Sequence, residues 1–181
     1  MPDDQRRLYY PEYGTVASLA GLVPVVAAAG PVTDVVAARA PTLPVGVLAA
    51  MALWGLLGVV LLGEYRRQAA ANPRTFESRG ARTRFCREGT PGQRRLLLAV
   101  TLFLVGGLLA TAFWPTYLDA AERVARALVA LPEVPGGTVW GDALELVLFG
   151  VVYGGFARGA DWVVVGLARM LIHRNLAMRG R

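Results

Sequence analysis

The sequence predicts an all-α integral membrane protein: a single helical domain covering residues 1–181, with about four transmembrane helices and two amphipathic interfacial helices. Three observations lead to this fold class. The chain is 55% hydrophobic, above the roughly 45–50% apolar content of soluble domains. The apolar residues are gathered into long uncharged blocks. A short, strongly basic segment, residues 64–95, separates two of these blocks.

The first span is predicted over residues 15–36. Residues 15–33 carry no charge, and about 20 residues at roughly 1.5 Å each cross the hydrocarbon core of a bilayer. Pro24 and Pro31 lie inside this span. Membrane helices tolerate proline where neighbouring groups satisfy the freed carbonyls, so we expect a kink near Pro24.

The same region resembles a signal peptide, because an apolar stretch ends in three alanines at 27–29. The preceding leader is not net positive, since Asp3, Asp4 and Glu12 offset Arg6 and Arg7. We therefore expect a retained membrane segment.

The second span is predicted over residues 44–63, where Gly46, Ala50, Gly55 and Gly58 allow a neighbouring helix to approach closely. The basic loop 64–95 follows. It holds nine of the nineteen arginines against three glutamates, a net charge of +6. Short loops rich in arginine stay on the cytoplasmic side of the membrane.

The third span is predicted over residues 96–115, the clearest uncharged block in the chain. An interfacial helix is then predicted over about 118–131. Val124, Leu128 and Leu131 share one face of it, while Glu122 and Arg126 lie on the other.

The last part of the chain permits two interpretations. The favoured one is a span over 139–158 followed by an interfacial helix over about 161–178. The alternative is one tilted helix from Glu145 to Ile172, which places Arg158 and Asp161 at mid-membrane depth as an ion pair three residues apart.

Four spans place both termini on the cytoplasmic side. In that arrangement sixteen arginines are cytoplasmic and three, Arg39, Arg123 and Arg126, lie outside. The abundance of Ala, Gly, Pro, Val and Arg is typical of a GC-rich genome. We expect the cytoplasmic (inner) membrane of a prokaryote.

Four charged residues are candidates for an ion or proton path, because ionisable groups within a membrane are costly and usually face a partner or water. They are Asp34, Glu145, Arg158 and Asp161. For Asp34 and Glu145 the favoured interpretation is interfacial carboxylates that reach water, since both lie near the ends of their spans.

Four glycines are candidates for helix packing. Gly150 and Gly154 form a GxxxG pair, and Gly155 and Gly159 repeat that spacing. Two glycines one turn apart let helix backbones approach closely. The pattern does not distinguish packing inside the chain from packing against a partner.

Eight arginines are candidates for docking lipid headgroups or a partner: Arg66, Arg67, Arg79, Arg82, Arg84, Arg87, Arg94 and Arg95. Anionic lipid is the favoured ligand. Nucleic acid is not favoured, because only Phe76 and Phe85 are available nearby for base stacking.

The sequence does not favour an enzyme, because it has no catalytic constellation, phosphate-binding loop or metal-ligand spacing. With one cysteine and one histidine, it indicates no particular cofactor. The leading hypothesis is a non-catalytic polytopic membrane subunit or scaffold that packs with other membrane subunits or with itself in a larger assembly. The alternative is a small oligomeric channel or transporter that uses intramembrane carboxylates.

Overall fold

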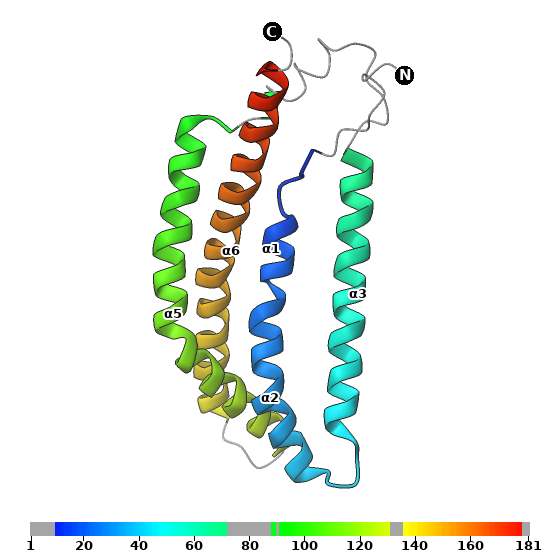
Figure 1. Ribbon diagram of the computed structural model, residues 1–181. Helices are drawn as coiled ribbons and strands as arrows, with labels where there is room; N and C mark the ends of the chain where they lie inside the picture. Colours follow the sequence, from blue (N-terminus) through cyan, green and yellow to red (C-terminus); the bar gives the residue numbers. More distant parts are fainter. Residues whose placement is uncertain (1–9, 72–87, 90, 131–135, 179–181) are drawn as a thin grey trace.

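The computed structural model describes residues 10–71, 88–89, 91–130 and 136–178, and in this part of the chain every regular element is a helix. Figure 1 shows the helices side by side in an elongated bundle. They are α1 (Thr15–Ala20), α2 (Leu22–Arg39), α3 (Val45–Ala71), α5 (Gln93–Val129) and α6 (Gly136–Met178).

Four helical segments are long and apolar enough to cross a membrane. They are Thr15–Arg39, formed by α1 and α2 together, Val45–Ala71, Gln93–Val129 and Val139–Asn175. Three of them contain the spans expected from the sequence, and Val45–Ala71 contains all but the first residue of the span expected over 44–63. The chain is therefore all-helical over its described residues, with the length and composition of a four-helix membrane protein.

The first span is divided at Gly21, where α1 ends and α2 begins. Pro24 explains the division, because proline has no N–H to offer the carbonyl four residues earlier. That carbonyl belongs to Ala20, and it accepts a hydrogen bond from the hydroxyl of Tyr153 at 3.0 Å instead. A second tyrosine hydroxyl, that of Tyr117, donates to the carbonyl of Pro24 at 2.8 Å.

The second span continues beyond the predicted start of the basic loop. α3 runs to Ala71, so residues 64–71 are helical rather than part of a loop. The residue that follows is Asn72, before Pro73, and helices usually end at or before the residue preceding a proline. At the other side of the loop, α5 already begins at Gln93.

The interfacial helix predicted over 118–131 is not a separate element. α5 is one helix of 37 residues that contains both the third span and most of this segment, with Pro115 inside it. Figure 1 shows that the C-terminal part of α5 turns away from the bundle axis and crosses toward α2. Pro115 accounts for a deflection without a break, because it removes one helical hydrogen bond.

The division predicted between residues 158 and 161 is also wrong, because α6 is one helix of 43 residues. The favoured interpretation treated Arg158 and Asp161 as the polar boundary of the membrane. Neither residue interrupts helical hydrogen bonding, and Asp161 is fully buried. The alternative of a single long helix is the better description, although α6 extends beyond Glu145 and Ile172 at both ends.

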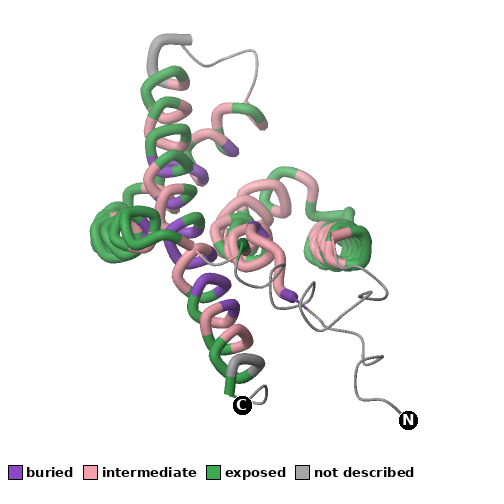
Figure 2. Tube along the Cα trace, turned by 90° about the horizontal axis from the view of Figure 1, so that it is seen from above, coloured by how far each residue is buried: buried purple, intermediate pink, exposed green. Residues whose placement is uncertain are grey.

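The core lies where α5 and α6 pack against each other and against α1, and it is mainly aromatic. Tyr117 and Phe149 stack with ring centroids 4.2 Å apart, and Trp114 meets Phe149 edge-on at 5.7 Å. Viewed from above, buried positions concentrate along α6 and its neighbours, whereas α3 has only intermediate and exposed positions (Figure 2).

Two glycines allow α5 and α6 to approach closely. A Cβ added to Gly106 of α5 would lie 2.9 Å from the backbone nitrogen of Phe156. A Cβ added to Gly159 of α6 would lie 2.5 Å from the backbone nitrogen of Phe103. Side chains at either position would force the two backbones apart.

Candidate functional site

A cluster of polar and charged side chains surrounds the start of α1. Its first member is Asp161 of α6, whose side chain accepts the backbone N–H groups of Gly14 at 2.5 Å and Val16 at 2.9 Å. The first N–H groups of a helix have no partner within the helix, and a carboxylate is favourable there because it also opposes the positive end of the helix dipole. Asp161 thus caps α1 from a different helix.

Gly14 makes this cap possible. It is the N-cap residue of α1 and has a φ of +104°, in the left-handed region that favours glycine. A Cβ on Gly14 would also lie 2.6 Å from a guanidinium nitrogen of Arg67. The backbone conformation therefore requires glycine at this position, whereas the contact with Arg67 involves the end of a flexible side chain that can shift.

Arg169 lies two helical turns beyond Asp161 and is only 6% exposed. Its guanidinium donates to the carbonyls of Pro11 at 2.8 Å and Gly89 at 3.0 Å, and it contacts the Glu12 carboxylate at 3.2 Å. It also lies over the rings of Tyr10 and Tyr13, at 4.6 Å and 4.2 Å from their centroids. A buried charge needs this many partners to offset its desolvation.

The end of α3 holds the same segment from the other side. Gln68 donates to the hydroxyl of Thr15 at 2.6 Å and accepts the N–H of Glu12 at 3.1 Å. Arg67 also donates to Thr15, at 3.2 Å, and pairs with Glu64 on its own helix. Residues 10–16 are thereby tied to α3, to α6 and to the segment around Gly89.

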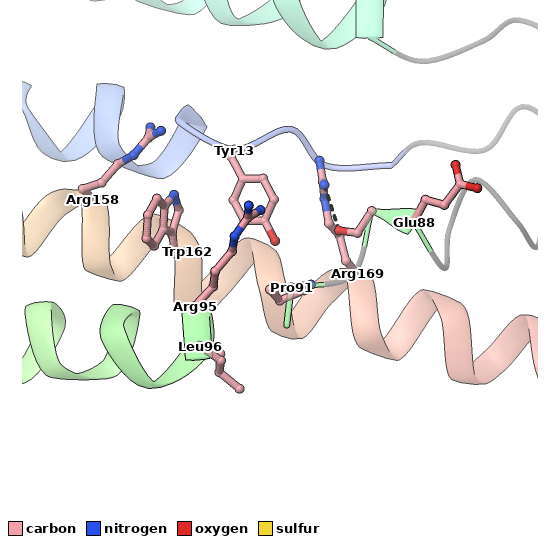
Figure 3. Close-up of a pocket in the computed structure, with 9 residues that line it drawn as sticks. Tyr13, Glu88, Pro91, Arg95, Leu96, Arg158, Trp162 and Arg169 are labelled. Atoms are coloured by element: carbon pink, nitrogen blue, oxygen red, sulfur yellow. Dashed lines mark hydrogen bonds between the residues drawn. The ribbon is translucent and has the colours of Figure 1, made fainter. Parts of the chain in front are cut away.

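A cavity of about 470 Å³ opens beside this cluster. Arg95 of α5 and Arg158 of α6 reach toward it with Trp162 between them, and Tyr13 lies behind (Figure 3). The Arg158 guanidinium lies 5.5 Å from the centroid of the Trp162 ring. Burial raises the pKa of the Tyr13 phenol above its ordinary value, although the nearby Arg169 acts in the opposite direction.

A second charged group lies at the opposite end of the bundle. Arg123 of α5 contacts Asp142 at 2.6 Å and Glu145 at 2.8 Å, both on α6. Beside it, Asp34 of α2 lines a groove together with Arg39, Glu122 and Arg126. These pairs are partly exposed, so each contributes little to stability.

The four residues predicted for an ion or proton path fall into two separate groups. Asp161 and Arg158 belong to the cluster at the start of α1, whereas Asp34 and Glu145 lie at the opposite end. Glu145 precedes Asp161 by sixteen residues of one helix, which is about 24 Å along its axis. Within the described chain, Arg158 and Asp161 make no ion pair with each other, in contrast to the pairing expected for a single long helix.

Only one of the four predicted packing glycines contacts another helix of the described chain. Gly159 packs on the backbone of α5, whereas a Cβ added to Gly150, Gly154 or Gly155 would meet no atom within 4 Å. The glycine that complements Gly159 is Gly106 of α5, which is not among the four predicted packing glycines.

The eight predicted docking arginines are placed as follows. Arg67 is engaged with Glu64 and Thr15, Arg66 and Arg94 are exposed, and Arg95 lines the cavity. Arg79, Arg82, Arg84 and Arg87 lie outside the described residues.

Sequence reasoning missed the central role of Arg169 and did not connect Tyr10, Tyr13 or Trp162 with a site. One signal was available. Asp161 and Arg169 are eight residues apart, so they share a face of a continuous helix. Because a break was predicted after residue 158, this shared face was not used to infer that Asp161 and Arg169 are directed away from lipid.

Comparisons with models of protein families, with curated proteins and with solved structures gave no match. The described residues also contain no group of three or more His, Cys, Asp or Glu side chains placed to hold a metal ion.

Proposed function

We propose that this chain is a non-catalytic polytopic membrane subunit that packs within a larger membrane protein assembly. The observation that carries the proposal is the outward-facing GxxxG pair of α6. Gly150 and Gly154 are both exposed, and a Cβ at either would meet nothing within 4 Å. Their neighbours on the same face, Val147 and Val151, are 61% and 69% exposed.

The physical argument rests on how helices associate in lipid. Lipid tails are as apolar as the side chains, so association depends on close packing at small residues rather than on hydrophobic burial. Gly106 and Gly159 serve this purpose between α5 and α6. Gly150 and Gly154 lie one turn apart on α6, and among the described residues no other helix lies within 4 Å of an added Cβ at either position. This open face suits a helix from another polypeptide.

α3 supports the proposal independently. Its four glycines, Gly46, Gly55, Gly58 and Gly63, face open space, and Trp54 in its middle is 73% exposed. Figure 2 shows α3 standing to one side of the other helices. A helix with small residues and so little intrachain packing offers a second face to a neighbour.

The proposal includes an orientation. The starts of α1 and α5 and the ends of α3 and α6 lie at one end of the bundle (Figure 1). Arg66 is near the end of α3, Arg94 is at the start of α5, and Arg174 is near the end of α6. Because arginine-rich segments are retained in the cytoplasm, we place this end on the cytoplasmic side of a prokaryotic inner membrane, in contact with anionic headgroups.

The channel or transporter hypothesis has weaker support. Its four candidate residues lie in two groups at opposite ends of the bundle, with Glu145 and Asp161 about 24 Å apart along α6. Asp161 is also already engaged in capping α1.

The test is the size of the protein after gentle extraction from its own membrane with a mild detergent. We expect the wild-type chain to migrate in a complex of defined stoichiometry, and Gly154→Leu to release it, because a leucine fills the space needed by the partner backbone. Circular dichroism and thermal unfolding of the released chain should match wild type, since the position is open within the chain.

Gly30→Leu is the matched control, because Gly30 of α2 is also exposed with nothing within 4 Å of an added Cβ. It should leave the complex intact. A wild-type chain that is monomeric in its native membrane, by in situ cross-linking, would refute the proposed assembly. Equal loss in Gly30→Leu and Gly154→Leu would refute the assignment to the α6 face.

A further inference from the structure

The cavity beside the α1 cluster contains positive charge that the fold does not use. Arg95 and Arg158 line it, and neither forms an ion pair with any carboxylate of the described residues. Arg169 also borders the cavity, but its guanidinium is occupied by Pro11, Gly89 and Glu12.

The one carboxylate among the lining residues does not neutralise this pair. Glu88 lies at the far side of the cavity, and Figure 3 shows its carboxylate pointing away from Arg95 and Arg158. Two guanidinium groups from different helices therefore face a space large enough for a ligand, and a phosphate group matches the geometry of guanidinium donors well.

The start of α5 adds further donors. α5 is 37 residues long, and its N-cap, Gly92, has no side chain to cap the first turn. The N–H of Leu96 is bonded to the carbonyl of Gly92, which leaves the preceding first-turn N–H groups for an external acceptor. Gly89, Pro91, Arg95 and Leu96 border the cavity from this side.

Part of the remaining wall of the cavity is apolar. Trp162, Pro91 and Leu96 line it, and the Trp162 ring stacks under Arg158. Tryptophan beside arginine is typical of the headgroup level of a bilayer. A ligand with a phosphate at one end and acyl chains at the other fits this combination better than a fully hydrated anion does.

We propose that this cavity binds the phosphate of an acidic phospholipid, held between Arg95 and Arg158 against the Trp162 ring. The site is independent of the proposed assembly, because all of its residues come from one chain. Lipid binding at this cavity also differs from a general attraction of anionic lipid to the basic loop, because it depends on Arg95 and Arg158 and not on the neighbouring arginines.

The experiment is native mass spectrometry of the full-length protein, delipidated in a neutral detergent and titrated with phosphatidylglycerol. Phosphatidylcholine in parallel samples gives the non-specific background. We expect one phosphatidylglycerol to bind above that background. Arg95→Gln and Arg158→Gln should each weaken it about tenfold or more, as loss of a charge-assisted contact predicts.

Arg94→Gln is the matched control, because Arg94 precedes Arg95 in the same turn and is exposed like it, but does not line the cavity. It should bind like wild type. Unchanged binding in Arg95→Gln and Arg158→Gln, or an equal loss in Arg94→Gln, would overturn the site. If Arg158→Gln does not fold, Arg158→Lys tests the same contact, because lysine keeps the charge but lacks the planar fork.

A second titration separates the two sources of a phosphate group. Inorganic phosphate is added to the delipidated protein at constant ionic strength, and the thermal midpoint is followed. No shift up to millimolar phosphate is expected for a lipid site. An Arg95-dependent shift that matches the one caused by phosphatidylglycerol would overturn the lipid as the ligand and assign the cavity to a soluble phosphate.

Discussion

Asp161 is a charged residue in the middle of a long apolar helix, and its environment explains how the fold accommodates it. Its carboxylate is fully buried, and its two oxygens accept one N–H each from Gly14 and Val16. An uncompensated buried charge is strongly unfavourable. The start of α1 supplies two donors and a favourable dipole, so the charge fixes the position of α1 against α6.

Asp161→Asn tests this role at the level of one residue. The amide keeps one acceptor oxygen but turns an NH₂ group toward a backbone N–H, and it loses the interaction with the helix dipole. We expect the free energy of unfolding to fall by about 1–3 kcal/mol, the usual cost of leaving a buried donor unsatisfied. Reversible unfolding with SDS in mixed micelles measures this change.

Asp34→Asn is the control for that experiment, because Asp34 is an exposed carboxylate on α2. The free energy of unfolding of the Asp34→Asn variant should stay within about 0.5 kcal/mol of wild type, as is usual for surface positions. If Asp161→Asn were equally neutral, the cap would not contribute to holding α1.

At the scale of the elements, the first span depends on a donor from another helix. Pro24 cannot bond the carbonyl of Ala20, and the hydroxyl of Tyr153 does so from α6. The prediction of a kink near Pro24 followed from proline alone. The donor was not predictable, because 133 residues separate Tyr153 from Ala20 and no local pattern joins them.

A double-mutant cycle tests this pairing. Tyr153→Phe alone should lower the free energy of unfolding by about 1–3 kcal/mol, since it leaves a partly buried carbonyl without a partner. In a Pro24→Ala background, residue 24 regains an N–H that can donate to the carbonyl of Ala20. Tyr153→Phe should therefore cost less stability in that background. Tyr117→Phe, which acts on the carbonyl of Pro24, should not show this coupling to Pro24→Ala.

The coupling is the interaction energy of the cycle, and contacting groups usually give about 0.5–3 kcal/mol. Additive effects of Tyr153→Phe and Pro24→Ala would mean that the tyrosine stabilises the bundle only through the packing of its ring, for which the contacts with Trp114 and Phe149 provide a basis.

The difference between local properties and contacts distant in sequence also explains what could be predicted about the longer helices. Apolar blocks of about 20 residues identify membrane-length helices because length and composition are local properties. The continuity of α6 was not predictable in this way. Arg158 and Asp161 resemble the polar end of a span, and only the contacts of Asp161 with Gly14 and Val16 show why the helix continues past them.

The cavity itself was not predicted from the sequence, for a related reason. Arg95 and Arg158 were both recognised as candidates, but for different roles, since they lie on different helices 63 residues apart. Their convergence depends on how closely α5 and α6 pack. Gly106 and Gly159 set that distance, and which glycines of a glycine-rich chain meet is a tertiary property.

At the scale of the whole molecule, the described helices divide into a packed unit and open faces. α5 and α6 share the aromatic core with α1, whereas α3 and the Gly150–Gly154 face of α6 have little intrachain contact. The two kinds of glycine on α6 therefore have opposite roles. Gly159 lets α5 and α6 pack closely, whereas Gly150 leaves open space on the outer face of α6.

Alanine at each position separates these roles in the purified chain. Gly159→Ala places a Cβ against the backbone of Phe103 and Ala99, which cannot move aside as a side chain would. We expect a loss of about 1–3 kcal/mol in the free energy of unfolding, as for other overpacked positions. Gly150→Ala meets open space, so it should be neutral or stabilising by up to about 1 kcal/mol through helix propensity.

Because both substitutions add one methyl group to the same helix, their difference isolates packing from propensity. SDS unfolding in mixed micelles, followed by circular dichroism, measures both variants against wild type. A destabilised Gly150→Ala chain would mean that the Gly150 face is packed within the monomer. That result would remove the observation on which the proposed subunit role depends, whereas a tolerant Gly150 beside an intolerant Gly159 leaves this face of α6 free for a neighbouring helix.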